Sequence, residues 1–343
     1  MADDRPWSHD IPDGPWDAVV VGSGMGGMSA AATLAKVGKR VLVLEQHNIP
    51  SGFTQTFKRP GYRWDVGVHI VGEMSDRSFP GRLLADLTDG RLAWEPVGDV
   101  YDEFHFPDGF VIQFPNSREA FREALVEAFP DETDAIDRYL ELVRQVARAS
   151  STSLQQRALP RMLAPGKKKA IAAAEPHWSR TTAEVLAGLT EDERLRSVLA
   201  AQWGYYGDPP SRSSFAMHAL MVAHFMRGAY YPVGTAQSIA PALLATVADA
   251  GGWTAVRRRV AEIVVDGGRV RGVRLEDGTE VPTKAGLSAA GAVQTARLAG
   301  EAWEPGYGEP GPAHLSLYLG FEGVDAPVAG ATRQCQWFYE TWS

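Results

Sequence analysis

Three glycines near the amino terminus have the spacing that a dinucleotide phosphate site requires. Gly22, Gly24 and Gly27 form the pattern G-x-G-x-x-G. The first glycine permits a tight turn, the second lets a pyrophosphate approach the backbone, and the third lets a helix pack close to the strands. Glu45 follows roughly 20 residues later, where a carboxylate can accept hydrogen bonds from ribose hydroxyls. The pattern therefore predicts that the chain binds a dinucleotide.

The elements around these residues have the order that the motif needs. Residues 17–21, DAVVV, are a short apolar run typical of a strand that is covered on both faces of a parallel sheet. An Ala- and Leu-rich helix follows, and a second apolar strand, residues 40–45, ends on Glu45. The free amides at the start of that helix favour phosphate binding. We expect a Rossmann-type β-turn-α-β unit; a Gly-rich loop of another α/β protein is the alternative.

The overall composition is that of an ordinary globular protein. The chain has 343 residues, of which 45% are hydrophobic and 22% charged, so we expect about two domains. Its net charge of -8 gives no indication of nucleic acid binding. Cys335 is the single cysteine, so no intramolecular disulfide can form. Without a secretory signal or a long apolar run, the sequence predicts a cytoplasmic protein.

The segment that follows the second strand differs from a plain NAD domain. Residues 49–69, IPSGFTQTFKRPGYRWDVGVH, contain small and turn residues where an NAD domain would continue with a helix and a strand. The motifs in this segment are Ser51-Gly52, Thr56-Phe57, Gly61-Tyr62 and Asp65-Val66-Gly67-Val68-His69. Such a composition suggests backbone that runs along an extended ligand.

With these motifs the chain resembles the flavin-dependent polyene oxidoreductases, which include phytoene desaturases, carotenoid isomerases and retinol saturase-like enzymes. Their pattern is a G-G pair, then T-F, then G-(F/Y)-x-x-D-x-G-x-H, and only Ser51 departs from it. Serine tolerates a positive φ poorly, so the family motif does not by itself predict the backbone angle at Ser51. Residues 204–243 resemble the same family, with Thr235 in place of the second glycine of Y-P-x-G-G, and so do residues 258–282.

The resemblance implies FAD as the cofactor and a conjugated polyene, a retinoid or a carotenoid, as the apolar substrate. The implied reaction is saturation, desaturation or isomerisation of C=C bonds. An amine-oxidase-like flavoenzyme on another substrate, or a truncated non-catalytic remnant, are the alternatives. The predicted cofactor-binding residues, with Val260 placed at the adenine by the resemblance, are Gly22, Ser23, Gly24, Met25, Gly26, Gly27, Glu45, Gln46, Gly52, Thr56 and Val260.

The sequence does not assign a general acid or base, and His69 is the one candidate for that role. We expect the flavin ring near Ser51, Gly52 and His69, where an imidazole could move a proton or only orient the backbone. His218 and His224 lie on one apolar stretch but do not share a helix face, so no metal site is predicted.

The predicted fold class is α/β: a Rossmann-like FAD-binding domain with an inserted antiparallel meander, plus an α+β substrate domain. The FAD-binding domain is discontinuous, residues 15–75 and 232–300. The substrate or cap domain comprises residues 76–231 and 301–343. It should contain a hairpin at residues 101–115 and a strand at residues 314–321, HLSLYLGF. The apolar residues 215–226 are either a buried core helix or the wall of an apolar tunnel.

Two further expectations concern the end of the chain and a basic segment. Flavoproteins of this group extend further and close a Gly-rich turn over the cofactor, so we expect a fragment that is incomplete at its C-terminus and retains FAD weakly. Residues 157–174 contain five basic and no acidic residues. They are either a solvated loop or a peripheral membrane contact through Arg157–Lys169, in which each basic residue near an anionic surface contributes about 1 kcal/mol.

Overall fold

The computed structural model describes residues 5–158, 171–172, 174–301, 314–322 and 334–342, and it divides into two compact units. Unit 1 comprises residues 1–69, 75–95 and 231–309, and unit 2 comprises residues 70–74, 96–230 and 310–343. Residues 76–95, which the sequence analysis places in the second domain, pack within unit 1. The roles of the units as cofactor and substrate domains stay a prediction.

Unit 1 is built on a four-stranded parallel sheet with the strand order β10-β2-β1-β14. Its strands are β1 (Ala18–Val21), β2 (Val41–Leu44), β10 (Trp253–Ala255) and β14 (Gly286–Ser288). The residues of β1 and β2 are buried on both faces, as the continuous apolar runs predict. β14 pairs in parallel with β1 and lies at the edge of the sheet.

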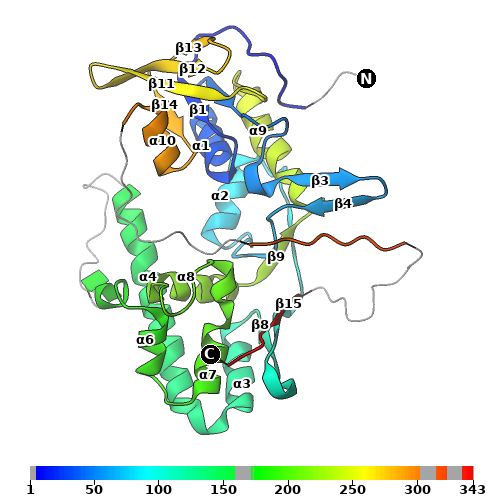
Figure 1. Ribbon diagram of the computed structural model, residues 1–343, viewed down its shortest axis with the longest axis vertical. Coiled ribbons are helices and arrows are strands. Elements are labelled where there is room, and N and C mark those ends of the chain that lie inside the picture. Colours follow the sequence, from blue (N-terminus) through cyan, green and yellow to red (C-terminus); the bar gives the residue numbers. More distant parts are fainter. Residues whose placement is uncertain (1–4, 159–170, 173, 302–313, 323–333, 343) are drawn as a thin grey trace. The chain divides into compact units, whose positions relative to one another are not determined.

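The two faces of this sheet are covered by different elements (Figure 1). Val19, Val21, Leu42 and Leu44 share one hydrophobic cluster with residues of the meander. The meander consists of β11 (Val260–Asp266), β12 (Arg269–Leu275) and β13 (Glu280–Pro282), paired antiparallel in that order. Because side chains alternate along a strand, the remaining apolar residues face the helices α1 (Met25–Lys36) and α9 (Ile239–Asp249), which pack together. This is the predicted Rossmann-like fold with its inserted meander.

The remaining elements of unit 1 include those of residues 49–69, the segment expected to run along the ligand. The hairpin of β3 and β4 sets Thr56 opposite Asp65, so the two ends of that motif lie side by side. These elements are η1 (Gly52–Thr54), β3 (Thr56–Arg59), β4 (Tyr62–Asp65), α2 (Phe79–Leu87), β6 (Trp94–Pro96), η6 (Ala236–Ser238) and α10 (Ala292–Leu298).

Unit 2 contains a mixed three-stranded sheet. β7 (Val100–His105) and β8 (Val111–Pro115) form an antiparallel hairpin through the turn η2 (Pro107–Gly109), which confirms the predicted hairpin. β15 (Cys335–Phe338) adds to β7 in parallel. A short strand, β5 (Val71–Gly72), pairs antiparallel with the start of β9 (Ala229–Pro232).

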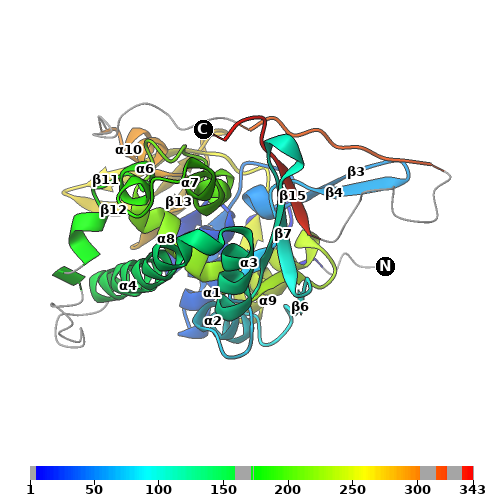
Figure 2. The ribbon, with the colours of Figure 1, turned by 90° about the horizontal axis from the view of Figure 1, so that it is seen from below.

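Helices supply most of the core of unit 2. They are α3 (Arg118–Ala128), α4 (Thr133–Ala158), α6 (Thr182–Ala187), α7 (Glu193–Ala200) and α8 (Phe215–Phe225), with short 3-10 turns η3 (Pro130–Glu132), η4 (Glu175–His177) and η5 (Ala201–Tyr205). The long helix α4 packs against α8, which can be followed in Figures 1 and 2. One face of α8 is fully buried: Phe215, His218, Ala219, Val222 and Phe225. That face belongs to the core, which agrees with the interpretation of residues 215–226 as a buried core helix.

The predictions for residues 314–321 and for the basic segment have different outcomes. Residues 314–321 form no strand, and Leu315 and Leu317 are 100% and 80% exposed, so the predicted strand is wrong. The alternating apolar pattern finds no ladder partner among the described residues, and a strand needs one. The basic segment expected to contact a membrane lies outside the described residues. Within the described part of the chain, no helix combines the length and the apolar character needed to cross a bilayer.

Candidate dinucleotide-binding site

The turn between β1 and α1 has the geometry that the glycine motif predicts. Gly22 adopts a φ of +93°, which favours glycine. A Cβ atom on Gly27 would lie 2.1 Å from the carbonyl oxygen of Gly22, so the helix approaches the strand as only glycine allows. A Cβ atom on Gly24 or Gly26 would meet nothing within 4 Å. The turn is therefore tight toward the sheet and open in front of the helix.

The start of α1 is left without a side-chain cap. Gly24 occupies the N-cap position and offers no acceptor to the first amides of the helix. The helices α9 and α10 also lack a side-chain cap, whereas α2, α3, α6, α7 and α8 each begin with a Ser, Thr or Asp side chain that accepts a hydrogen bond from the first turn. Uncapped amides at a helix start carry partial positive charge and bind anions. The site therefore fits a pyrophosphate.

Glu45 is held at the tip of β2 and points toward the glycine turn. Its Oε2 atom accepts hydrogen bonds from the backbone N–H of Ser23, at 2.9 Å, and from the Ser23 hydroxyl, at 2.5 Å. Its Oε1 atom accepts one from the backbone N–H of His47, at 2.8 Å. A carboxylate has about four acceptor positions, so capacity remains for a ribose hydroxyl. The buried Ser23 side chain turns inward to Glu45, which leaves the space before Gly24 open.

The Ser51-Gly52 loop packs directly on this turn. The backbone N–H of Ser51 donates to the carbonyl oxygen of Ser23 at 3.1 Å. A Cβ atom on Gly52 would lie 3.0 Å from the Cα atom of Gly24. Ser51 itself has a φ of 122°, so the chain keeps the glycine-like backbone angle although the residue is serine. Such strained backbone persists only where the surrounding structure enforces it, and it is common at ligand sites.

A second strained turn is held by Asp65, at the end of β4. The Oδ2 atom of Asp65 accepts hydrogen bonds from the Tyr231 hydroxyl and, at 3.2 Å, from the backbone N–H of Ala236. Burial and the bond to Asp65 raise the pKa of Tyr231, which keeps this hydroxyl a donor. Between these residues, Thr235 has a φ of 68°, and its buried hydroxyl has no hydrogen-bond partner in the described structure. Sequence analysis listed both motifs but missed this connection.

The end of β2 and the start of β11 enclose a hollow beyond Glu45. The backbone N–H groups of Arg257 and Arg258 donate to the carbonyl oxygens of His47 and Glu45. The hollow has a volume of about 600 Å³ and is lined by Gln46, His47, Arg257, Arg258, Arg259, Leu275, Glu276 and Asp277. Val260, which follows this turn, is buried in the core between sheet and meander. The space suits the end of a dinucleotide that lies beyond the ribose.

The other predicted residues occupy different positions. Thr56 begins β3 and is half-buried, Met25 and Gly26 lie at the helix start, and Gln46 is exposed at the hollow. His69 is exposed at the end of its segment. Nothing in these positions tests their roles, which stay predictions.

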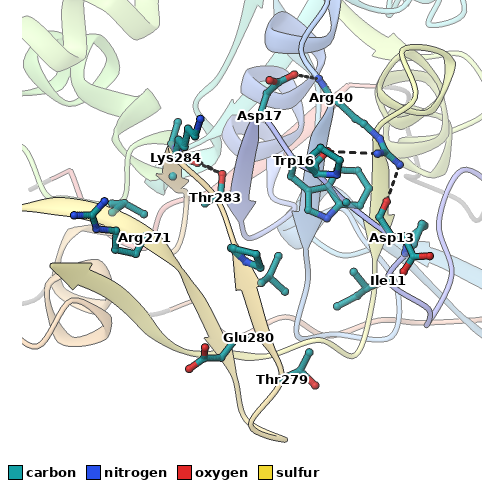
Figure 3. A pocket seen from close by; sticks show the side chains of 18 of the residues that line it. Ile11, Asp13, Trp16, Asp17, Arg40, Arg271, Thr279, Glu280, Thr283 and Lys284 are labelled. Carbon is teal, nitrogen blue, oxygen red and sulfur yellow. Dashed lines mark hydrogen bonds between the residues drawn. The ribbon is translucent and has the colours of Figure 1, made fainter.

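A further cavity of unit 1, about 1450 Å³, lies at the amino-terminal ends of the strands, opposite the glycine turn (Figure 3). It is bounded by residues at the starts of β1 and β14 and by Arg40 before β2. The guanidinium of Arg40 stacks over Trp16 at 4.5 Å and donates to the carbonyl oxygen of Asp13. Ligands of open parallel sheets bind at the carboxyl ends of the strands, so this cavity is not the dinucleotide site.

Comparison with known proteins agrees with the Rossmann-like fold of unit 1. A family model described as an NAD(P)-binding Rossmann-like domain matches residues 20–84. A solved structure of a protein from Pyrococcus furiosus superposes with a TM-score of 0.58, covering 82% of this chain and 61% of that one at 19% identity. At that identity the likeness shows the fold alone.

Sequence relatives match most of this chain. All-trans-retinol 13,14-reductase of Danio rerio is 38% identical over 258 residues, which cover 73% of this chain and 42% of that protein. Prolycopene isomerase 2 of an Oncidium hybrid cultivar is 30% identical over 285 residues, covering 80% of this chain and 48% of that protein. The chain thus spans less than half the length of these relatives. Over the matched residues it is similar to retinol saturase-like and carotenoid isomerase-like proteins, the group that its motifs resemble.

Proposed function

We propose that unit 1 binds FAD and that the protein is an oxidoreductase of conjugated polyenes. In this proposal the pyrophosphate lies at the uncapped start of α1, before Gly24 and Gly26, and the adenosine ribose is held by Glu45. The adenine occupies the hollow beside Gln46 and Val260. The flavin ring lies toward Gly52 and Thr56.

The Asp65 connection supports FAD over a nicotinamide dinucleotide. A nicotinamide domain needs only the glycine turn and the acidic residue. Here the Ser51-Gly52 loop packs on the glycine turn, and Asp65 ties the Thr235 turn to the same unit. Two strained turns, held by residues far apart in sequence, are the observation that carries this choice, because a longer ligand gives them a purpose.

A polyene substrate is supported by the relatives, whose names specify retinol and prolycopene. Bound flavin supplies the redox chemistry, and the protein supplies placement and exclusion of water. The residues of this chain act by orienting: Ser51 and Thr235 fix the two turns, and Asp65 holds Tyr231 as a hydrogen-bond donor. His69 remains the candidate for moving a proton. These relatives give no support to the amine-oxidase-like alternative.

Product identification after anaerobic incubation tests this proposal. Purified protein supplied with FAD and a chemical reductant is incubated with all-trans-retinol or with prolycopene, and the polyene is analysed by chromatography and absorbance. We expect a shortened or geometrically changed chromophore with one of them, and no change with FAD omitted. Turnover of an amine and of neither polyene would overturn the substrate assignment while leaving the cofactor assignment intact.

Peripheral membrane contact by residues 157–169 belongs to the same proposal, because a polyene partitions into bilayers. Sedimentation with vesicles of anionic or zwitterionic phospholipid tests it. We expect binding to the anionic vesicles only, and equal binding to both would contradict an electrostatic contact.

A further inference from the structure

A cavity in unit 2 has the features of a binding site, and its lining contains none of the motifs described above. It lies where α4 packs on α8 and has a volume of about 560 Å³, within the range of small-molecule sites. Its apolar wall is formed by Leu140, Val143, Ala147, Leu220, Ala223 and Met226. All atoms of this cavity belong to unit 2, so it can be considered by itself.

Helical spacing places the basic residues of the cavity together. Arg144 and Arg148 are one turn apart on α4, on the face that also carries Leu140 and Ala147. Arg118, the first residue of α3, and Arg227, just after α8, are joined because the backbones of Ser117 and Arg227 form an antiparallel bridge. Four guanidinium groups therefore surround one apolar floor.

The carboxylates nearby do not neutralise this set. Glu141 accepts a hydrogen bond from Nε of Arg144 at 2.8 Å, and its carboxylate lies 3.9 Å from the guanidinium of Arg118. Glu73 pairs with Arg227 and with Nδ1 of His224, and it is the only carboxylate in the described lining. Arg148 has no ion pair among the described residues, and the hydroxyl-bearing Ser151 and Thr152 lie on the following turn. The cavity is thus positively charged in a chain whose net charge is -8.

His224 lies between the backbone of Gly72 and the carboxylate of Glu73. Its Nε2 atom accepts a hydrogen bond from the backbone N–H of Gly72 at 2.8 Å, so that nitrogen carries no proton. Its Nδ1 atom faces Oε2 of Glu73 at 3.5 Å. The imidazole therefore holds Glu73 in place, and the charge available to a ligand comes from the arginines.

We propose that this cavity binds an anionic amphiphile, a molecule with a carboxylate or phosphate head and an unbranched apolar tail. The head lies at Arg148, because Arg144 is already paired with Glu141 and an unpaired guanidinium group can bind such oxygens in a bidentate manner. The tail lies against the apolar floor between α4 and α8, which offers area and few hydrogen-bonding groups. A free fatty acid and a lipid of a membrane surface share this chemistry.

Equilibrium binding of matched probes tests the head and the tail separately. The probes are dodecyl phosphate below its micelle concentration, dodecanol as the uncharged analogue, and inorganic phosphate. We expect one dodecyl phosphate per chain by calorimetry, with binding that weakens as salt rises. Dodecanol and inorganic phosphate should each bind about tenfold or more weakly. Equal binding of dodecanol would overturn the proposal, because the arginines would then contribute nothing.

Variants locate the site. Arg148→Gln should weaken dodecyl phosphate binding about tenfold, as expected for loss of a charge-assisted hydrogen bond. Arg122→Gln removes an arginine of α3 that lies outside the cavity and pairs with Asp137, and this variant should bind as the wild type does. Ala223→Trp fills the floor and should weaken dodecyl phosphate binding but not phosphate binding. Unfolding midpoints are measured for each variant, and unchanged affinity in a folded Arg148→Gln protein would overturn the assignment.

Vesicles distinguish the two sources of the ligand. Sedimentation with phosphatidylglycerol vesicles, abolished by Arg148→Gln, would identify a membrane lipid as the ligand. Binding of monomeric dodecyl phosphate without an Arg148-dependent vesicle interaction would identify a free amphiphile. Both results support the cavity as an anion site, and neither depends on FAD, so a failure of the cofactor proposal would be seen separately.

Discussion

The two units place their unusual groups in different parts of the structure. Unit 1 has an open glycine turn with an uncapped helix start, and it has strained backbone at Ser51, beside that turn, and at Thr235. In unit 2 the side chains of Asp102 and His218 are completely buried. Strain around an open space is typical of a ligand site, whereas a satisfied buried network stabilises one packing arrangement. The contrast supports the proposal that unit 1 binds the cofactor, and it makes the stability of unit 2 sensitive to pH.

The largest expected effect concerns His218 in unit 2. Burial lowers its pKa to about 3, and Tyr139 and Tyr206 hydrogen-bond its two ring nitrogens. A neutral buried imidazole stabilises the fold above the unfolded pKa of 6.5, and that stability is lost as pH falls toward 3. The loss over that range is about 5 kcal/mol. Urea unfolding of the wild type and His218→Gln between pH 7.5 and 4.5 should show the wild type losing stability faster on acidification; parallel curves would contradict this.

Asp102 should give the opposite slope. Burial raises its pKa to about 6, despite hydrogen bonds from Tyr205, Trp337 and Gln202. Because the folded pKa lies above the unfolded value of 3.8, folding is favoured at low pH and loses about 3 kcal/mol as pH rises from 4 through 6. Asp102→Asn should therefore gain stability relative to the wild type over that rise. A constant difference between the two proteins across this pH range would refute the prediction.

In unit 1, two adjacent glycines should respond in opposite ways. Gly27→Ala places a Cβ atom 2.1 Å from a backbone oxygen that cannot move freely, and the expected destabilisation is about 3 kcal/mol. Gly26→Ala meets nothing within 4 Å and should stabilise the helix by about 1 kcal/mol. Chemical denaturation measures both, and a similar effect at the two positions would mean that the turn is not closely packed.

The smallest effect tests the strain itself. Thr235→Gly removes a side chain from a left-handed position and a buried hydroxyl without a described partner, so we expect a gain of about 1 kcal/mol. Ala236→Gly, at the next buried position, should lose about 1 kcal/mol by the usual cost of glycine. A loss of stability in Thr235→Gly would show that the threonine side chain has a structural role.

The sequence alone predicted most of unit 1 and much less of unit 2. The glycine turn, Glu45 and the meander follow from local patterns, because each is encoded by contiguous residues. The bond between Asp65 and Tyr231 joins segments that are distant in sequence, so no local pattern specified it. The same holds for the arginines of the α4–α8 cavity, which come from three elements. The strand expected at residues 314–321 failed because alternation cannot supply a partner strand.

Equilibrium titration of the Gly24→Val variant with FAD tests most directly the central claim that the glycine turn binds the cofactor. Gly24 has ordinary angles, φ -64° and ψ 172°, and free space around its Cβ position, so valine should fold there while filling the pyrophosphate space. Ala30→Val, further along α1, is the matched control. Measured by quenching of flavin fluorescence, the wild type and Ala30→Val should bind FAD with the same affinity, and Gly24→Val at least about a hundredfold more weakly. Equal binding by a folded Gly24→Val protein would contradict the assignment of this turn as the cofactor site.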